Sequence, residues 1–194
     1  LCDNINPVTN GNLTSRTYDK RRVGYDLNFH APKSLSLLYA LSQDEKILAA
    51  FRSAVAETMK EIESDMKTRV RIGGKNADRE TGNMIWGEFV HLTARPVNSI
   101  PDPHLHAHCF TFNATYDKVE KKWKAGQFFD IKRYAPYYEA TFHTRLAEKI
   151  SNLGYGIRRT AKRWEIQGIE RQTIQKFIHR TQAIEKLAKE KNIT

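Results

Sequence analysis

The chain has 194 residues, of which 40% are hydrophobic and 28% are charged. These proportions are ordinary for a globular protein with one sizeable core. The sequence shows no membrane span and no signal peptide, so we expect a cytoplasmic protein without a membrane partner. Its 32 basic and 22 acidic residues give a net charge of +10, which favours a polyanionic partner such as nucleic acid over a merely charged surface. Cys2 and Cys109 lie far apart, which argues against a disulfide framework.

The N-terminal part predicts a loop, a strand and two helices. Residues 1–20 are rich in Asn, Pro, Gly, Thr and Ser, which is typical of a loop. Residues 22–29 alternate apolar and polar side chains, which predicts a strand. A helix is expected to begin near Pro32 and to run to Leu41. Residues 43–67 carry apolar side chains at three- and four-residue steps, which predicts an amphipathic helix.

The C-terminal part predicts further strands and helices around one domain over 1–194. The expected strands are 70–72 and 84–91, joined by a long loop at 73–83, and then 107–116 and 123–128. We expect a helix over 131–153, a short hairpin over 156–166 and basic helices over 170–194. This mixed order predicts an α+β fold with a central antiparallel sheet and helices packed on it.

Three histidines form the strongest chemical pattern. His106 and His108 share one face of the predicted strand because side chains alternate along a strand. His91 ends an earlier apolar segment, and an antiparallel pairing could bring it beside them. Three imidazoles at one point bind a divalent metal ion and leave positions open for a substrate. His104 alternates with the same face, but we expect Pro103 to set the strand entry and to displace it.

The remaining histidines, Cys109 and Asp26 carry weaker chemical signals than the three-histidine pattern. His30, His143 and His179 have no partner by spacing, so we expect them at the surface or satisfied in the core, and Cys109 in the core. Asp26 lies on the polar side of a strand, where an acidic residue is disfavoured unless it is exposed or used. It is a candidate to orient a metal-bound histidine, and an exposed edge carboxylate is the alternative.

The order of these segments resembles the MobF-type conjugative relaxases, which belong to the histidine-hydrophobic-histidine endonucleases. The resemblance is carried by residues 22–36 (RVGYDLNFHAPKSLS), 89–95 (FVHLTAR), 102–108 (DPHLHAH) and 112–115 (FNAT). It implies a relaxase-like or rolling-circle-nuclease-like fold and a monomer that acts with other relaxosome proteins. The implied reaction is the metal-dependent nicking and rejoining of single-stranded DNA at a plasmid or mobile-element transfer origin.

The resemblance also assigns roles to residues of this chain. It places the metal ligands at His91, His106 and His108, and it makes Asp26 the acidic residue that orients a ligand or helps to activate the nucleophile. Lys33 and Arg95 fall in the family's motifs and are assigned to DNA contacts. The family uses Mg or Mn, whereas three imidazoles also suit Zn or Ni.

Two departures from the family pattern stand out. The stretch from His91 to His106 is longer than in the best-known members of the family, and the extra length lies around residues 97–100. The family's nucleophilic tyrosine precedes the strand that carries Asp26, and the segment before that strand holds only Tyr18, without the surrounding motif. We therefore expect the nucleophile upstream of Leu1, and we expect Tyr25, Tyr137 and Tyr138 to pack or to line the surface.

Three other functions are compatible with features of the same sequence. A rolling-circle replication initiator shares the same chemistry. A non-enzymatic module for origin or single-stranded DNA binding would use the metal to stabilise its fold. A metal-dependent hydrolase of small molecules would leave the +10 charge unexplained.

Overall fold

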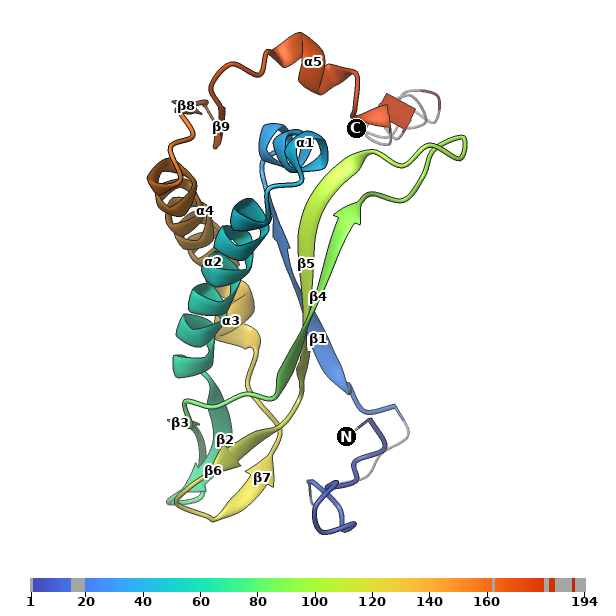
Figure 1. Ribbon diagram of the computed structural model, residues 1–194. Coiled ribbons are helices and arrows are strands. Elements are labelled where there is room, and N and C mark those ends of the chain that lie inside the picture. Colours follow the sequence, from blue (N-terminus) through green and yellow to red (C-terminus); the bar gives the residue numbers. More distant parts are fainter. Residues whose placement is uncertain (1, 15–19, 162, 180–181, 184–189, 191–194) are drawn as a thin grey trace. The chain divides into compact units, whose positions relative to one another are not determined.

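The computed structural model describes residues 2–14, 20–161, 163–179, 182–183 and 190 (Figure 1). The chain forms two compact units that each combine three stretches of sequence. The first unit consists of Leu1–Asn28, Val55–Phe89 and His108–Phe142. The second consists of Phe29–Ala54, Val90–Ala107 and His143–Thr194. No described helix is long and apolar enough to cross a membrane.

A three-stranded sheet contributes to both units. Its strands are β1 (Gly24–His30), β5 (Pro103–Phe112) and β4 (Trp86–Thr93), in the order β1-β5-β4. Ala31 donates its N–H to the carbonyl of Leu105, and Asn113 donates to that of Val23, so β1 and β5 run antiparallel. The predicted α+β class with an antiparallel sheet is confirmed.

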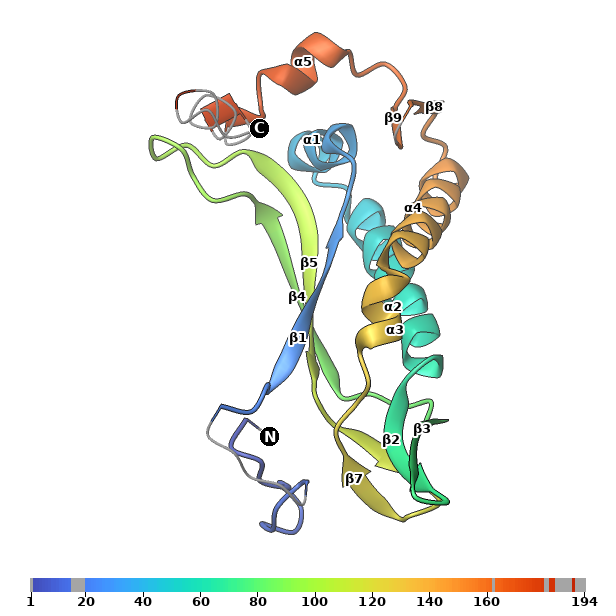
Figure 2. The same ribbon diagram turned by 180° about the vertical axis from the view of Figure 1, so that it is seen from behind.

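In the first unit, helix and sheet side chains form an apolar core. α2 (Glu45–Ser64) contributes Val55, Met59 and Ile62, and β5 contributes Cys109. Phe142 of α4 (Ala135–Asn152) is also buried. Gly24 gives β1 room beside β5, because a Cβ there would clash with the Thr111 carbonyl and the Phe110 ring. Figures 1 and 2 show these helix segments on one face of the sheet segment.

The first unit also holds two hairpins that were not predicted from the sequence. β2 (Lys67–Ile72) pairs with β3 (Lys75–Glu80), and β6 (Thr115–Asp117) pairs with β7 (Lys122–Lys124). The expected long loop over 73–83 is therefore wrong, because Gly73 and Gly74, both at positive φ, turn the chain directly from β2 into β3. β3 has no apolar alternation, so its pattern does not predict a strand.

The predicted helix over 131–153 is divided in two. α3 (Phe129–Arg133) ends at Arg133, Tyr134 follows it, and α4 begins at Ala135. Pro136 therefore lies in the first turn of α4, where its missing N–H costs no helical hydrogen bond. The helix was predicted to continue through Pro136, whereas the structure places a break directly before it.

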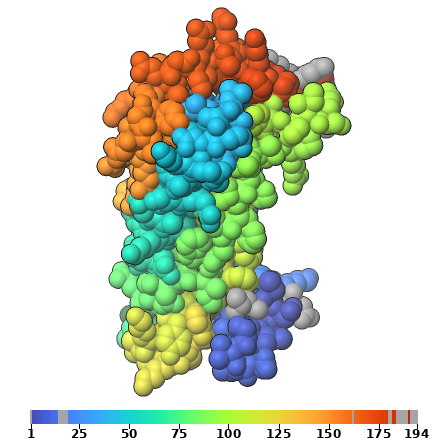
Figure 3. Space-filling view, viewed as in Figure 1, coloured from blue at the N-terminus to red at the C-terminus, as the bar shows by residue number. Residues whose placement is uncertain are grey.

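The second unit builds a cap from α1 (Lys33–Ser42), β8 (Ile157–Arg159), β9 (Trp164–Ile166) and α5 (Arg171–Gln175). The Glu165 carboxylate accepts the N–H and the hydroxyl of Ser34, and Ser34 Oγ accepts the Ile166 N–H at 2.7 Å. These bonds fix the start of α1 against β9 because they satisfy donors that the helix leaves open. In the space-filling view, α5 lies against α1 (Figure 3).

Most predicted elements of this unit are confirmed. α1 and the β8–β9 hairpin lie within a few residues of the expected bounds. The expected basic helices over 170–194 are represented by α5 and by helical residues 182–183 and 190. The remainder of 180–194 lies outside the described residues.

Burial makes Cys109 unreactive. Its side chain is fully buried, and burial, followed by the nearby Glu88 and Asp26 carboxylates, raises its pKa to about 12. At pH 8 the thiolate is then about a 10⁻⁴ fraction of the folded protein. We expect iodoacetamide at pH 8 to modify the exposed Cys2 only, and both cysteines after denaturation. Mass spectrometry showing two adducts on the folded chain would contradict this placement.

Candidate metal centre

β5 carries alternating histidines on one face and core residues on the other. Its odd-numbered residues from Leu105 to Thr111 are buried, whereas the even-numbered residues are partly exposed. His104, His106 and His108 therefore share one face by the two-residue repeat. The strand thus presents three imidazoles away from the side chains that hold it in the core.

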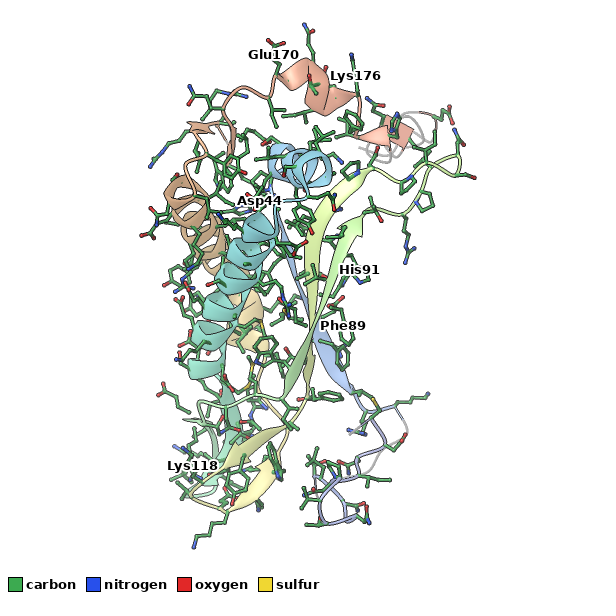
Figure 4. All side chains as sticks on the ribbon, in the orientation of Figure 1. Asp44, Phe89, His91, Lys118, Glu170 and Lys176 are labelled. Carbon is green, nitrogen blue, oxygen red and sulfur yellow. The ribbon has the colours of Figure 1, made fainter. Side chains whose placement is uncertain are left out.

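His106 has a ring orientation that suits metal binding. Its Nδ1 lies 2.9 Å from the backbone carbonyl oxygen of His104. A carbonyl only accepts, so Nδ1 is assigned the proton and Nε2 the lone pair. His91 of β4 stacks near this ring, with centroids 5.3 Å apart, and projects away from the helices in Figure 4. The second unit therefore brings His91 and His106 together.

In the first unit, Asp26 of β1 orients His108. The carboxylate Oδ2 lies 2.7 Å from His108 Nδ1. This contact places the proton on Nδ1 and the lone pair on Nε2, which is the usual arrangement of a carboxylate behind a metal-binding imidazole. The side chains of His108 and Asp26 are 37% and 44% exposed, so both are accessible to a substrate.

Two further histidines join the cluster in the second unit. His104 is not displaced by Pro103, because β5 begins at Pro103 and the His104 ring lies 4.4 Å from the His106 ring, centroid to centroid. His30 ends β1, and its Nδ1 lies 3.3 Å from His104 Nε2. His30, which we expected at the surface or satisfied in the core, is half-buried and satisfied by this contact. Its place at the end of a strand beside β5 depends on sheet order, which spacing along the chain does not reveal.

The described residues do not form a complete metal cage. Among them, no three His, Cys, Asp or Glu side chains are placed to hold one metal ion. The chemistry of the donors nevertheless fits a metal, since imidazoles dominate and contacts to a carbonyl and a carboxylate fix two of them as Nε2 ligands.

A pocket of about 560 Å³ lies beside the histidine pair in the second unit. Its lining includes Lys33, Asp102, Arg163 and Glu165 with His30 and His104. Asp102 is buried and lies 2.7 Å from His179 Nδ1 through Oδ1. Arg163 and Glu165 were not recognisable as lining residues from the sequence, because they come from the β8–β9 hairpin, more than fifty residues further along the chain than His104.

The structure places the two candidate DNA-contact residues differently. Lys33 is half-buried at the start of α1, and its Nζ donates to the Pro103 carbonyl at 2.7 Å. Burial lowers its pKa, and the nearby Asp102 partly opposes that change. Arg95 is exposed in the connection between β4 and β5. Lys33 thus stabilises the start of β5, whereas the Arg95 side chain is exposed to solvent.

Tyr138, Tyr25 and Tyr137 each pack against or pair with a neighbour in the first unit. The Tyr138 hydroxyl donates to Asp65 Oδ2 at 2.6 Å, and burial, followed by this hydrogen bond, raises its pKa. Tyr25 stacks on Phe128 with centroids 4.1 Å apart. Tyr137 donates to Glu61 at 2.7 Å. Tyr18 lies outside the described residues.

Comparison with known proteins identifies a consistent set of relatives. A family model described as TrwC relaxase matches residues 1–194. The multifunctional conjugation protein TraI of Escherichia coli is 30% identical over 175 residues, which cover 86% of this chain and 10% of TraI. TraI of Escherichia coli strain K12 is 29% identical over the same length and coverage. The chain therefore spans about a tenth of these curated relatives.

Solved structures of TrwC match the fold closely. The metal-free complex of conjugative relaxase TrwC with oriT DNA is 31% identical, with a TM-score of 0.88 over 97% of this chain and 66% of that one. The copper-bound complex with oriT DNA is 32% identical, with a TM-score of 0.85 over 93% of this chain and 60% of that one.

Proposed function

The chain belongs to the TrwC relaxase family of MobF-type conjugative relaxases, and we propose from this membership that it is the metal-binding core of a DNA-nicking enzyme. The proposed reaction cleaves and rejoins one DNA strand at a transfer origin by phosphodiester transesterification. The TrwC structures similar to this chain are complexes with oriT DNA, and the net charge of +10 suits a polyanionic substrate.

We assign the metal ligands to His91, His106 and His108. The observation that supports this assignment is that the Asp26 carboxylate and the His104 carbonyl contact Nδ1 of His108 and of His106, which leaves Nε2 of each ring as the nitrogen for a metal ion. The TrwC structures include metal-bound and copper-bound forms. We propose Mg or Mn as the working ion, with Zn or Ni as ions that the three imidazoles also accept.

The proposed roles divide the chemistry among the chain's residues. A bound divalent cation supplies neutralisation of the charge that develops on the phosphoryl oxygens. His108 is held in place by Asp26, so its imidazole does not need to reorient during the reaction. Arg95 extends to solvent, where it contacts the phosphate backbone. Lys33 holds the entry to β5 and faces the pocket, where it contributes positive charge toward the same strand of DNA.

The nucleophile is proposed to be a tyrosine upstream of Leu1. A denaturing-gel assay tests this with single-stranded DNA from the transfer origin and Mn²⁺, comparing this chain with a version extended upstream. A covalent adduct with the extended protein alone supports the proposal. An adduct with both proteins would place the nucleophile within the chain, and Tyr18 would be replaced first. Tight DNA binding without any adduct in either protein would instead favour a non-enzymatic binding module.

Replacing Asp26 with asparagine should weaken metal binding by about 10–100-fold, because the amide no longer accepts the His108 Nδ1 proton as a charged partner. Isothermal titration with Mn²⁺ measures the change directly. Asp44→Asn is the control, since Asp44 bonds Tyr155 at 2.9 Å and not a histidine. Equal affinities for the two variants would remove Asp26 from the metal site.

A further inference from the structure

The second unit contains a histidine pair that the proposed nicking chemistry does not use. His30 ends β1 and His104 lies near the start of β5, and these strands are neighbours in the sheet. The two rings are nearly parallel, with an interplanar angle of 14° and centroids 5.1 Å apart. His30 Nδ1 and His104 Nε2 lie 3.3 Å apart.

This separation matches that of two ligands on one metal ion. Two imidazole nitrogens bound at about 2.0–2.1 Å in tetrahedral geometry lie roughly 3.3 Å from each other. The two nitrogens face each other in the hydrogen-bonded arrangement, so both rings rotate to direct their lone pairs to one ion.

The backbone around the pair is fixed by hydrogen bonds. Ala31 donates its N–H to the Leu105 carbonyl at 3.0 Å, directly beside both histidines. Leu105 in turn donates its N–H to the buried Ser36 hydroxyl at 3.0 Å. Hydrogen bonds of the neighbouring residues thus hold the backbone of the two histidines in place, so little ordering remains to be done when an ion binds.

We propose that His30 and His104 bind a transition-metal ion, separately from the three histidines assigned to nicking. Imidazole-only donors favour Cu²⁺, Ni²⁺ and Zn²⁺ over Mg²⁺, which prefers oxygen ligands. Because no third His, Cys, Asp or Glu completes a cage among the described residues, water fills the other positions. The open side faces the pocket that Asp102 and Glu165 also line.

The site adjoins the proposed nicking centre without sharing its ligands. The His106 ring lies 4.4 Å from the His104 ring and 5.6 Å from the His30 ring. Imidazole-seeking ions should therefore occupy two positions on the chain, whereas Mn²⁺ should occupy one. This difference is measurable by counting ions, with no need for DNA or nicking activity.

Equilibrium dialysis of the chain with Ni²⁺, followed by metal analysis, tests the proposal. Wild type is expected to bind two ions, the His30→Ala/His104→Ala variant one, and the His91→Ala/His108→Ala variant one. Mn²⁺ should bind with the same stoichiometry to wild type and to His30→Ala/His104→Ala. An unchanged Ni²⁺ count and affinity in His30→Ala/His104→Ala would overturn the proposal.

The same experiment separates this site from the proposed nicking centre. One Ni²⁺ on wild type and none on His30→Ala/His104→Ala would support the histidine pair and remove the three-histidine site. Electron paramagnetic resonance of Cu²⁺ bound to His91→Ala/His108→Ala should show coupling to two imidazole nitrogens, and absence of such coupling would overturn the pair. Melting curves without metal, together with a His30→Gln/His104→Gln variant, show whether loss of binding reflects loss of the fold.

Discussion

Replacement of His106 by alanine is expected to slow nicking of transfer-origin DNA by about 10³-fold. A divalent ion contributes several kcal/mol to stabilising the transition state, and each 1.36 kcal/mol is tenfold in rate. His106 lies beside His91 and is two residues from His108 on β5, so its loss removes the middle ligand of the proposed set. Single-turnover cleavage with Mn²⁺, by the protein extended upstream of Leu1, measures the effect.

The comparison variant for this measurement is His179→Ala. His179 is 47% exposed and contacts Asp102, so its removal should change the nicking rate by less than a few-fold. Melting temperatures without metal distinguish a catalytic site from a structural one. If His106→Ala unfolds the metal-free protein, the metal site belongs to a stabilising module, and the nicking proposal loses its support.

Replacement of Asp117 by alanine is expected to destabilise the fold by about 3 kcal/mol or more. The Asp117 side chain is 1% exposed, and its two oxygens lie 3.0 and 2.8 Å from Arg79 Nη1. It also accepts the N–H groups of Val119 and Glu120 at 3.0 and 3.2 Å. Removing one partner of a buried ion pair leaves the other charge and several donors unsatisfied, which is the costly case. Urea unfolding of both proteins gives the difference.

The pH dependence of the Asp117 effect has a definite sign. Burial pushes the pKa of Asp117 up, but hydrogen bonds from the Glu120 N–H, Arg79 and the Val119 N–H outweigh it, and the pKa falls below 3.8. This stabilisation is therefore present above the unfolded pKa and is lost as the pH falls through the folded pKa. The difference in free energy of unfolding between wild type and Asp117→Ala should therefore decrease at acidic pH.

Asp78→Ala is the matched control for this prediction. Asp78 pairs with Arg69 at 3.5 Å, and both side chains are exposed by 40% or more. Exposed pairs contribute about 0–1 kcal/mol, so this variant should unfold close to wild type. Equal losses for Asp78→Ala and Asp117→Ala would show that burial of the Asp117 ion pair adds nothing.

Elements with a buried apolar stripe were predictable from the sequence. The periodic residues of α2 point into the core, and Val55, Met59 and Ile62 are all buried. β3 was missed because five of its six residues are polar and most are exposed, so its sequence has no pattern of buried apolar side chains. Backbone pairing with β2 and a two-glycine turn form this strand instead, and such pairing has no signature in a single segment.

In the candidate site, too, only the features that depend on neighbouring residues in the sequence were predictable. The shared face of His106 and His108 follows from strand alternation alone. The contacts from Asp26 to His108 and from His30 to His104 depend on which strand lies next to β5 and in which register. Arg79 of β3 is likewise bound by Asp117 of β6, a partner that its own segment does not reveal. The role of each of these side chains therefore depends on a partner from a distant segment of the chain.

The alternation of β5 restricts how this strand can change. Its odd-numbered residues from Leu105 to Thr111 are buried in the interior, and its even-numbered residues, which include the histidines, lie on a partly exposed face. Deleting or inserting one residue would invert every side chain beyond the change, placing histidines in the core and Cys109 in water. Substitutions can therefore alter packing or chemistry one position at a time, whereas a change of length by a single residue would damage both together.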